Sequence, residues 1–125
     1  MGTDKLSNAE QEIMEVIWGC GEAMTAREVF EKLADKDWKY TTVATFLTRL
    51  VKKGVLVCRK RGIQNCYEEK IGRNRYLAEQ ADEFVRDMYD GSAKNLIACL
   101  CKERISESDY RELMEMLGKY EQGGK

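Results

Sequence analysis

The feature that most constrains the fold is a change in the spacing of apolar residues near the middle of this 125-residue chain. As far as Gly54, apolar residues recur every three or four positions, the spacing of helices buried along one side. The run 55–58 is instead rich in β-branched residues, and Gly62 separates it from a second short run at 65–67, a pattern typical of a β-hairpin. The chain has no proline, which favours helices with short connections. The sequence therefore predicts a mostly α fold with a small β-hairpin.

Three helices are predicted before the hairpin. The first two begin at capping boxes, Ser7 with Glu10 and Thr25 with Glu28, in which each side chain bonds the backbone of the other residue. The third ends at Gly54, behind two lysines at the negative end of the helix dipole. The apolar stripes are Ile13, Met14, Ile17 and Trp18; Ala26, Val29, Phe30 and Leu33; and Val43, Phe46, Leu47, Leu50 and Val51. Three helices followed by a hairpin is the order of a winged helix-turn-helix domain.

Charge is distributed unevenly along the chain, although the net charge is only -1. Residues 36–61 contain eight Lys or Arg and one Asp, whereas residues 1–35 contain eight acidic and three basic residues. A basic segment of this size is commonly a solvated surface, or a face that meets an acidic protein partner. Here it coincides with the third helix and the hairpin, the two elements that such a fold places against DNA. We therefore predict a DNA-binding domain over residues 1–70, with a helical protein-interaction module as the alternative.

The remainder of the chain, residues 71–125, is predicted to be helical. Its amphipathic helices are too short to form a stable core alone, so their apolar stripes must pack against the first domain or a second copy of the chain. A protein that binds a two-fold symmetric DNA site favours the second arrangement, a homodimer formed by a helical dimerisation region. The residues predicted to form the interface are Leu77, Ala81, Phe84, Met88, Leu96, Ile97, Leu100, Tyr110, Leu113, Met114 and Leu117.

Two stretches carry patterns more specific than apolar spacing. They are Leu6-Ser7-Asn8-Ala9-Glu10-x-x-Ile13-Met14-x-x-Ile17-Trp18 and Trp38-x-Tyr40-Thr41-Thr42-Val43-x-Thr45-x-Leu47-x-Arg49-Leu50-x-Lys52-Lys53-Gly54. Both resemble the penicillinase repressor family, which includes BlaI, MecI and CopY, and the similarity runs from about Leu6 to Leu117. The resemblance implies a dimeric winged-helix transcriptional repressor that blocks promoters by binding inverted repeats in double-stranded DNA, in control of a resistance or stress operon.

The resemblance also implies that residues 41–53 enter the major groove. Short Thr side chains let this helix seat deeply, and their methyl groups suit the methyl group of thymine. Arg49 and Lys52 would reach phosphates or a guanine edge, while Lys60 and Arg61 at the end of the hairpin would hold the DNA backbone. The predicted DNA-binding residues are Thr41, Thr42, Thr45, Thr48, Arg49, Lys52, Lys53, Lys60 and Arg61.

The chain departs from the family pattern at two places, and one type of family member offers an alternative function. Ala44 stands where members commonly carry an Arg in the recognition helix, so the operator sequence cannot be transferred. Members that respond to β-lactams are released from DNA when a sensor protease triggers cleavage of an Asn-Phe bond. The resemblance therefore adds a sensor protease to DNA and a second copy of the chain as predicted partners. Ala98-Cys99 replaces that pair, which argues against proteolytic release and leaves the inducer open. A copper-responsive repressor of the same family is the alternative. Members of that type carry two Cys-x-Cys pairs near the C-terminus that bind the metal. This chain has one such pair, Cys99 and Cys101, whose side chains would face different sides of a helix.

Composition excludes several other classes. The absence of His removes Ser-His and Cys-His nucleophile pairs and every His-bearing metal site. Five Cys residues at irregular spacing predict free thiols, including Cys58 and Cys66 near one another across the hairpin. No apolar run is long enough to cross a membrane, and no signal-peptide pattern opens the chain. We expect a cytoplasmic protein that is not an enzyme and requires no cofactor or metal.

Overall fold

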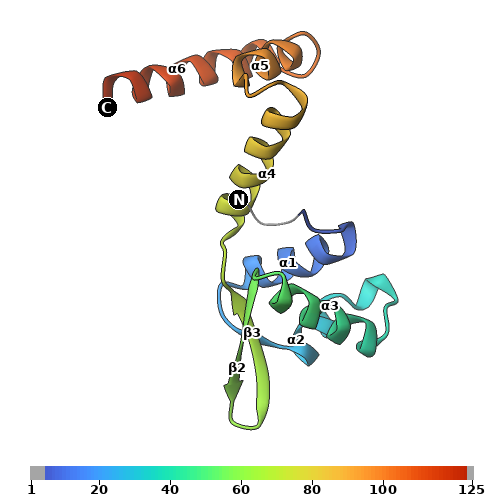
Figure 1. Cartoon of the computed structure of the whole chain (residues 1–125). Helices are drawn as coiled ribbons and strands as arrows, with labels where there is room; N and C mark the ends of the chain where they lie inside the picture. Colours follow the sequence, from blue (N-terminus) through green and yellow to red (C-terminus); the bar gives the residue numbers. More distant parts are fainter. Residues whose placement is uncertain (1–4, 124–125) are drawn as a thin grey trace. The chain divides into compact units, whose positions relative to one another are not determined.

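The structure is a computed structural model that describes residues 5–123 (Figure 1). It divides into two units, Met1–Ala81 and Asp82–Lys125. The elements are α1 (Asn8–Cys20), β1 (Met24–Thr25), α2 (Ala26–Lys32), the short 3-10 helix η1 (Ala34–Lys36), α3 (Tyr40–Lys52), β2 (Leu56–Arg61), β3 (Gln64–Glu69), α4 (Arg73–Met88), α5 (Ala93–Cys101) and α6 (Glu107–Gly123). The predicted fold class, mostly α with a small β-hairpin in a winged helix-turn-helix arrangement, is confirmed.

The hairpin is part of a three-stranded antiparallel sheet in which β3 lies between β1 and β2. Its register runs from Leu56 opposite Glu69 to Arg61 opposite Gln64. Gly62 has a φ of 65°, a left-handed conformation that a tight turn requires and glycine adopts without strain. The strand β1 was not predicted, because two residues are too few to display an alternating pattern.

Both predicted capping boxes are present at the starts of α1 and α2. The Ser7 hydroxyl accepts a hydrogen bond from the N–H of Glu10 at 3.2 Å, and the Glu10 carboxylate accepts one from the N–H of Ser7 at 2.9 Å. Thr25 and Glu28 make the same two bonds at 3.1 and 2.8 Å. These bonds satisfy backbone donors that have no partner within the helix, and each cap is worth ~1 kcal/mol.

The three apolar stripes meet in one core. The fully buried residues of the core include Ile13, Met14 and Ile17 of α1, Val29 of α2, Val43, Leu47 and Leu50 of α3, Val55 just before β2 and Leu56 at its start. Each such side chain stabilises the fold by about 1.5–3 kcal/mol relative to an exposed one. The core therefore holds α3 from one side and leaves its opposite side facing solvent.

The first turns of α4 also belong to this core. Tyr76 is 2% exposed, and its hydroxyl accepts a hydrogen bond from the N–H of Leu6 at 2.9 Å. The indole N–H of Trp18 donates to the carbonyl of Ile71 at 3.0 Å. The Trp18 and Tyr76 rings also meet, with centres 5.7 Å apart, so the start of α4 packs on α1, and the first compact unit runs to Ala81.

The second unit contains the end of α4 together with α5 and α6. Among its side chains that the structure describes, Val85 alone is buried. The large apolar residues Phe84, Met88, Ile97, Leu100, Tyr110, Met114, Met116 and Leu117 are between 37% and 67% exposed. The predicted stripes are therefore present on these helices, and their large apolar side chains are partly exposed. No helix within residues 5–123 has the length and apolar character needed to cross a membrane.

Candidate nucleic-acid interface

The exposed side of α3 carries most of the residues predicted to contact DNA. Val43, Leu47 and Leu50 lie fully in the core and fix the orientation of the helix. The opposite side presents Thr41, Thr45, Thr48, Arg49 and Lys52, all exposed, with Thr42 half-buried at its border. Positions three and four apart share a helix face, so these side chains form one surface rather than a scattered set.

Two side chains on this face are ordered by their own helix. The Thr48 hydroxyl donates to the carbonyl of Ala44 at 3.1 Å, a bond within the helix that fixes the orientation of this side chain. The guanidinium of Arg49 lies 5.5 Å from the centre of the Phe46 ring, a cation–π distance. Within the described part of the chain Arg49 has no carboxylate partner, so its charge is available to an anion.

Lys53, by contrast, is engaged inside the fold. Its Nζ lies 2.7 Å from a carboxylate oxygen of Glu10, whose side chain is only 4% exposed. Burial of the Glu10 carboxyl opposes ionisation, but the hydrogen bonds from Lys53 and Ser7 and the charge of Lys53 together hold its pKa below the ordinary value of 4.5. Lys53 therefore joins the end of α3 to the start of α1, a role that sequence reasoning missed because the two residues are far apart in the chain.

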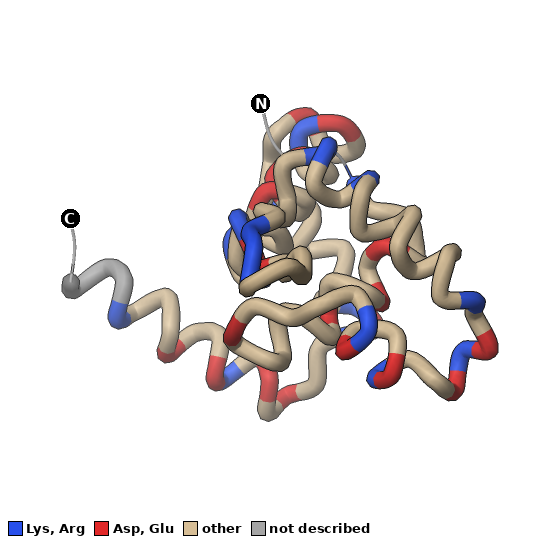
Figure 2. Tube along the Cα trace, turned by 90° about the horizontal axis from the view of Figure 1, so that it is seen from below, with Lys and Arg blue, Asp and Glu red and all other residues tan. Residues whose placement is uncertain are grey.

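The basic residues of the hairpin differ in their freedom to bind DNA. Lys60 is exposed and makes no ion pair with any described residue. The guanidinium of Arg61 donates to the carbonyl of Ala23, just before β1, at 3.1 Å and lies 4.0 Å from Glu28 of α2. Arg59 pairs with Glu68 across the hairpin at 3.0 Å. Figure 2, seen from below, shows the Lys and Arg positions of the hairpin in blue.

One exposed cation near this face was not predicted. Arg27, in the first turn of α2, lies outside the basic segment of the sequence, and its guanidinium is 4.8 Å from the centre of the Tyr40 ring at the start of α3. Nothing in the sequence pattern around Arg27 signals this contact, because α2 and α3 meet only through tertiary packing.

All five cysteines lie within the described residues and are free thiols. Cys58 lies opposite Tyr67 and Cys66 lies opposite Arg59, so Cys58 and Cys66 occupy neighbouring positions but face opposite sides of the hairpin. Cys58 is exposed and Cys66 is buried, and both are free thiols. Cys99 and Cys101 are exposed on α5. Over residues 5–123, no three Cys, Asp or Glu side chains are grouped so that they could hold a metal ion.

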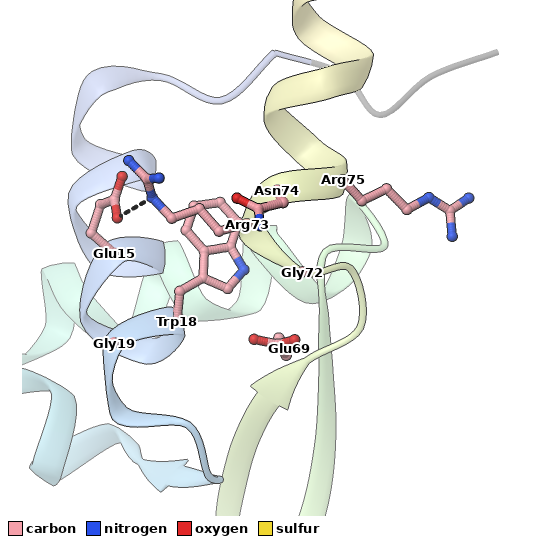
Figure 3. A pocket seen from close by; sticks show the side chains of 8 residues that line it. All are labelled: Glu15, Trp18, Gly19, Glu69, Gly72, Arg73, Asn74 and Arg75. Atoms are coloured by element: carbon pink, nitrogen blue, oxygen red, sulfur yellow. Dashed lines mark hydrogen bonds and ion pairs between the residues drawn. The ribbon is translucent and has the colours of Figure 1, made fainter. Parts of the chain in front are cut away.

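A separate hollow of about 370 Å³ lies between α1 and the start of α4 (Figure 3). Arg73 closes one side of it by donating to Glu15 at 2.8 Å, and the Trp18 indole forms part of its wall. The hydrogen bond from Arg73 lowers the pKa of the Glu15 carboxyl from its ordinary value. These contacts join the two helices and lie away from the exposed side of α3.

The three helices, the antiparallel hairpin and the exposed side of α3 define a winged helix-turn-helix protein. Comparison with known proteins agrees: the model of the penicillinase repressor family matches residues 6–119. The chain belongs to this family. It is 28% identical to the penicillinase repressor of Bacillus licheniformis over 117 residues, 93% of this chain and 91% of that protein. It is 30% identical to the methicillin resistance regulatory protein MecI of Staphylococcus aureus (strain N315) over 125 residues, 94% of this chain and 96% of that protein.

The chain is also similar to solved structures of a related repressor, each of which covers about three fifths of it. The solution structure of the DNA-binding domain of the repressor BlaI covers 61% of this chain and 94% of its own, at 35% identity and a TM-score of 0.52. The monomeric form of Bacillus licheniformis BlaI in complex with the blaP half-operator covers 59% and 90%, at 35% identity and a TM-score of 0.51.

Proposed function

We propose that this chain is a DNA-binding transcriptional repressor that binds an inverted-repeat operator as a homodimer and blocks the promoter by occupying it. The observation that carries the proposal is the exposed side of α3, where threonines lie beside Arg49 and Lys52, which form no ion pair with a described residue, on a helix whose other side is buried in the core. A relative of the same fold, BlaI, has been solved with a half-operator. Because the DNA that it binds in this proposal is genomic, we place the protein in the cytoplasm.

Within the proposed complex, the roles divide by residue type. Thr41, Thr45 and Thr48 offer short side chains with methyl groups to the floor of the major groove. Arg49 reaches a guanine edge or a phosphate, and Lys52 and Lys60 neutralise phosphates on either side. Lys53 and Arg61 are already bonded to protein groups, so we expect them to contribute less to DNA affinity than the free cations do.

The second unit supports the homodimer in this proposal. Its apolar stripes remain exposed in the single chain, and a patch of this kind on a repressor is best explained by a second copy. Leu77 and Ala81 lie on α4 within the first unit, and the other predicted interface residues lie in the second. Linking two DNA-binding units raises the effective concentration of the second to roughly millimolar, which multiplies affinity by about 10² or more. A signal that loosens the dimer would therefore release the promoter.

Two observations argue against release of this chain from DNA by a sensor protease. The Ala98-Cys99 peptide bond lies inside α5, where the backbone is hydrogen-bonded rather than extended. A protease would have to unwind this helix before cleavage, and the Asn-Phe pair of the β-lactam-responsive members is absent.

The proposal is tested by selecting binding sites from random-sequence DNA with the full chain. Fluorescence anisotropy then compares the selected inverted repeat, one isolated half-site and a scrambled duplex of equal length at ~150 mM salt and at lower salt. We expect the inverted repeat to bind at least about 10³-fold more tightly than the scrambled duplex. Equal, salt-sensitive binding to all three duplexes would contradict a specific repressor and favour a polyanion-binding module.

A further inference from the structure

A hollow of about 260 Å³ opens beside the exposed side of α3. It is bounded by four elements of the first unit: Thr25 in β1, Arg27 in α2, Tyr40 and Ala44 in α3, and Gln64 and Asn65 in β3. Ala44 lies on the same face of the helix as Thr41 and Thr48, three and four positions away. The hollow is therefore continuous with the surface that we assign to DNA, and the small Ala44 side chain keeps it open.

The chemistry of the hollow suits an anion. None of its lining residues carries a carboxylate, whereas Glu15 and Glu69 line the hollow between α1 and α4. The polar groups that it offers include the Arg27 guanidinium, two side-chain amides and the hydroxyls of Tyr40 and Tyr67, all of which donate hydrogen bonds. Burial and contact with Cys58 raise the pKa of the Tyr67 hydroxyl, so it keeps its proton.

Arg27 is held in place before any ligand arrives. Its guanidinium lies 4.8 Å from the centre of the Tyr40 ring and 5.7 Å from that of Phe30, and the two rings meet edge to face at 5.6 Å. Stacking on aromatic rings restricts the long side chain but leaves N–H groups at the edge of the guanidinium free to donate. No ion pair holds Arg27 anywhere in the described chain, although Glu28 follows it directly.

We propose that this hollow is a subsite for one phosphate of the DNA backbone and that Arg27 is its cation. The inference rests on the proposed function, since it assigns a further contact to the same interface. In a helix-turn-helix the helix before the recognition helix crosses the backbone, and α2 holds that place here. A guanidinium binds a phosphate through two parallel hydrogen bonds, and the amides of Gln64 and Asn65 add donors from the opposite wall.

The test compares pairs of variants of the full chain on the selected inverted repeat and on the scrambled duplex. Arg27→Ala removes the cation, and Arg75→Ala is its control, because it removes the same charge from α4, where Arg75 pairs with Glu79. Asn65→Asp places a negative charge in the hollow, and Asn74→Asp makes the same change in the hollow between α1 and α4. Arg27→Lys keeps the positive charge but removes the planar guanidinium and its two parallel N–H donors.

We expect Arg27→Ala and Asn65→Asp to weaken binding to both duplexes by about tenfold or more, while the two controls stay within about twofold of the unsubstituted chain. Arg27→Ala should also reduce the slope of log affinity against log salt by about one, which a purely structural role would not do. Arg27→Lys should retain that slope with a smaller loss of affinity.

Unchanged affinity and salt slope in Arg27→Ala, with the unsubstituted chain still bound to its operator, would overturn the subsite and leave the repressor function standing. Failure of the unsubstituted chain to bind any duplex would instead overturn both. A thermal unfolding curve for each variant identifies any loss of affinity that arises from unfolding.

Discussion

Replacement of Lys53 by Met should reveal a buried electrostatic link between α1 and α3. The ammonium lies 2.7 Å from the Glu10 carboxylate, which is 4% exposed, while Lys53 itself is 30% exposed. Removing one partner of a buried ion pair typically costs 3–5 kcal/mol, because the remaining charge has lost its compensation. Glu10 keeps its hydrogen bond from the Ser7 N–H and the lysine is partly solvated, so we expect a loss of about 2–3 kcal/mol in the free energy of unfolding.

Urea unfolding followed by circular dichroism at one protein concentration measures this loss. Lys52→Met is the matched control, since its side chain is exposed on α3 and we expect a change of less than ~0.5 kcal/mol. Adding Glu10→Gln to Lys53→Met should recover part of the loss, because the buried charge is then absent and an amide can still complete the capping box. Equal stabilities of the Lys53→Met and Lys52→Met variants would refute the reasoning.

The same pair predicts a dependence on pH. The pKa of the Glu10 carboxyl is lowered in the folded chain, so its stabilising contribution is present above the ordinary value of 4.5 and is lost as the pH falls through the folded value. Without Lys53, only the hydrogen bonds from Ser7 still favour the ionised Glu10 carboxyl, while its burial continues to oppose ionisation. The difference between the original chain and Lys53→Met should therefore be fully present near neutral pH and shrink below pH 4.5, as the pH falls through the folded pKa of Glu10. A constant difference would show that the lost interaction is not ionic.

The remaining predictions concern DNA binding, assembly and surface tolerance. Arg49→Ala should weaken operator binding by ~1–3 kcal/mol in anisotropy titrations, and equal affinity would remove Arg49 from the interface. Lys60→Ala should weaken all duplexes alike and flatten the salt dependence, whereas a loss confined to one sequence would contradict a phosphate contact. Phe84→Asp, at a side chain 48% exposed, should shift sedimentation velocity towards the monomer and lower affinity for the inverted repeat but not for one half-site; an unchanged dimer would place the interface elsewhere. Ile63→Ser should leave the melting temperature unaltered, since Ile63 is 95% exposed.

Local patterns were sufficient to predict most elements of the first unit. The capping boxes mark the starts of α1 and α2 because both partners lie within one helical turn. The apolar stripe of α3 correctly identified its buried side, and therefore its exposed side, because helical periodicity alone determines which positions share a face. The hairpin followed from Gly62 between two short β-rich runs. Membership of the penicillinase repressor family was likewise readable from the string around Thr41–Gly54.

Contacts between residues distant in the chain could be assigned only from the tertiary structure. Packing of Tyr76 against Leu6, 70 residues away, extends the first unit into α4. The sequence places Lys53 among the candidate DNA contacts, yet the fold directs it to Glu10, 43 residues earlier. Arg27 lies in an acidic stretch, and only the packing of α2 on α3 brings it to the hollow beside Ala44. Periodicity predicts which face of a helix a side chain occupies. The residue that it contacts depends on which distant segments the folded chain brings together, and no local pattern encodes this.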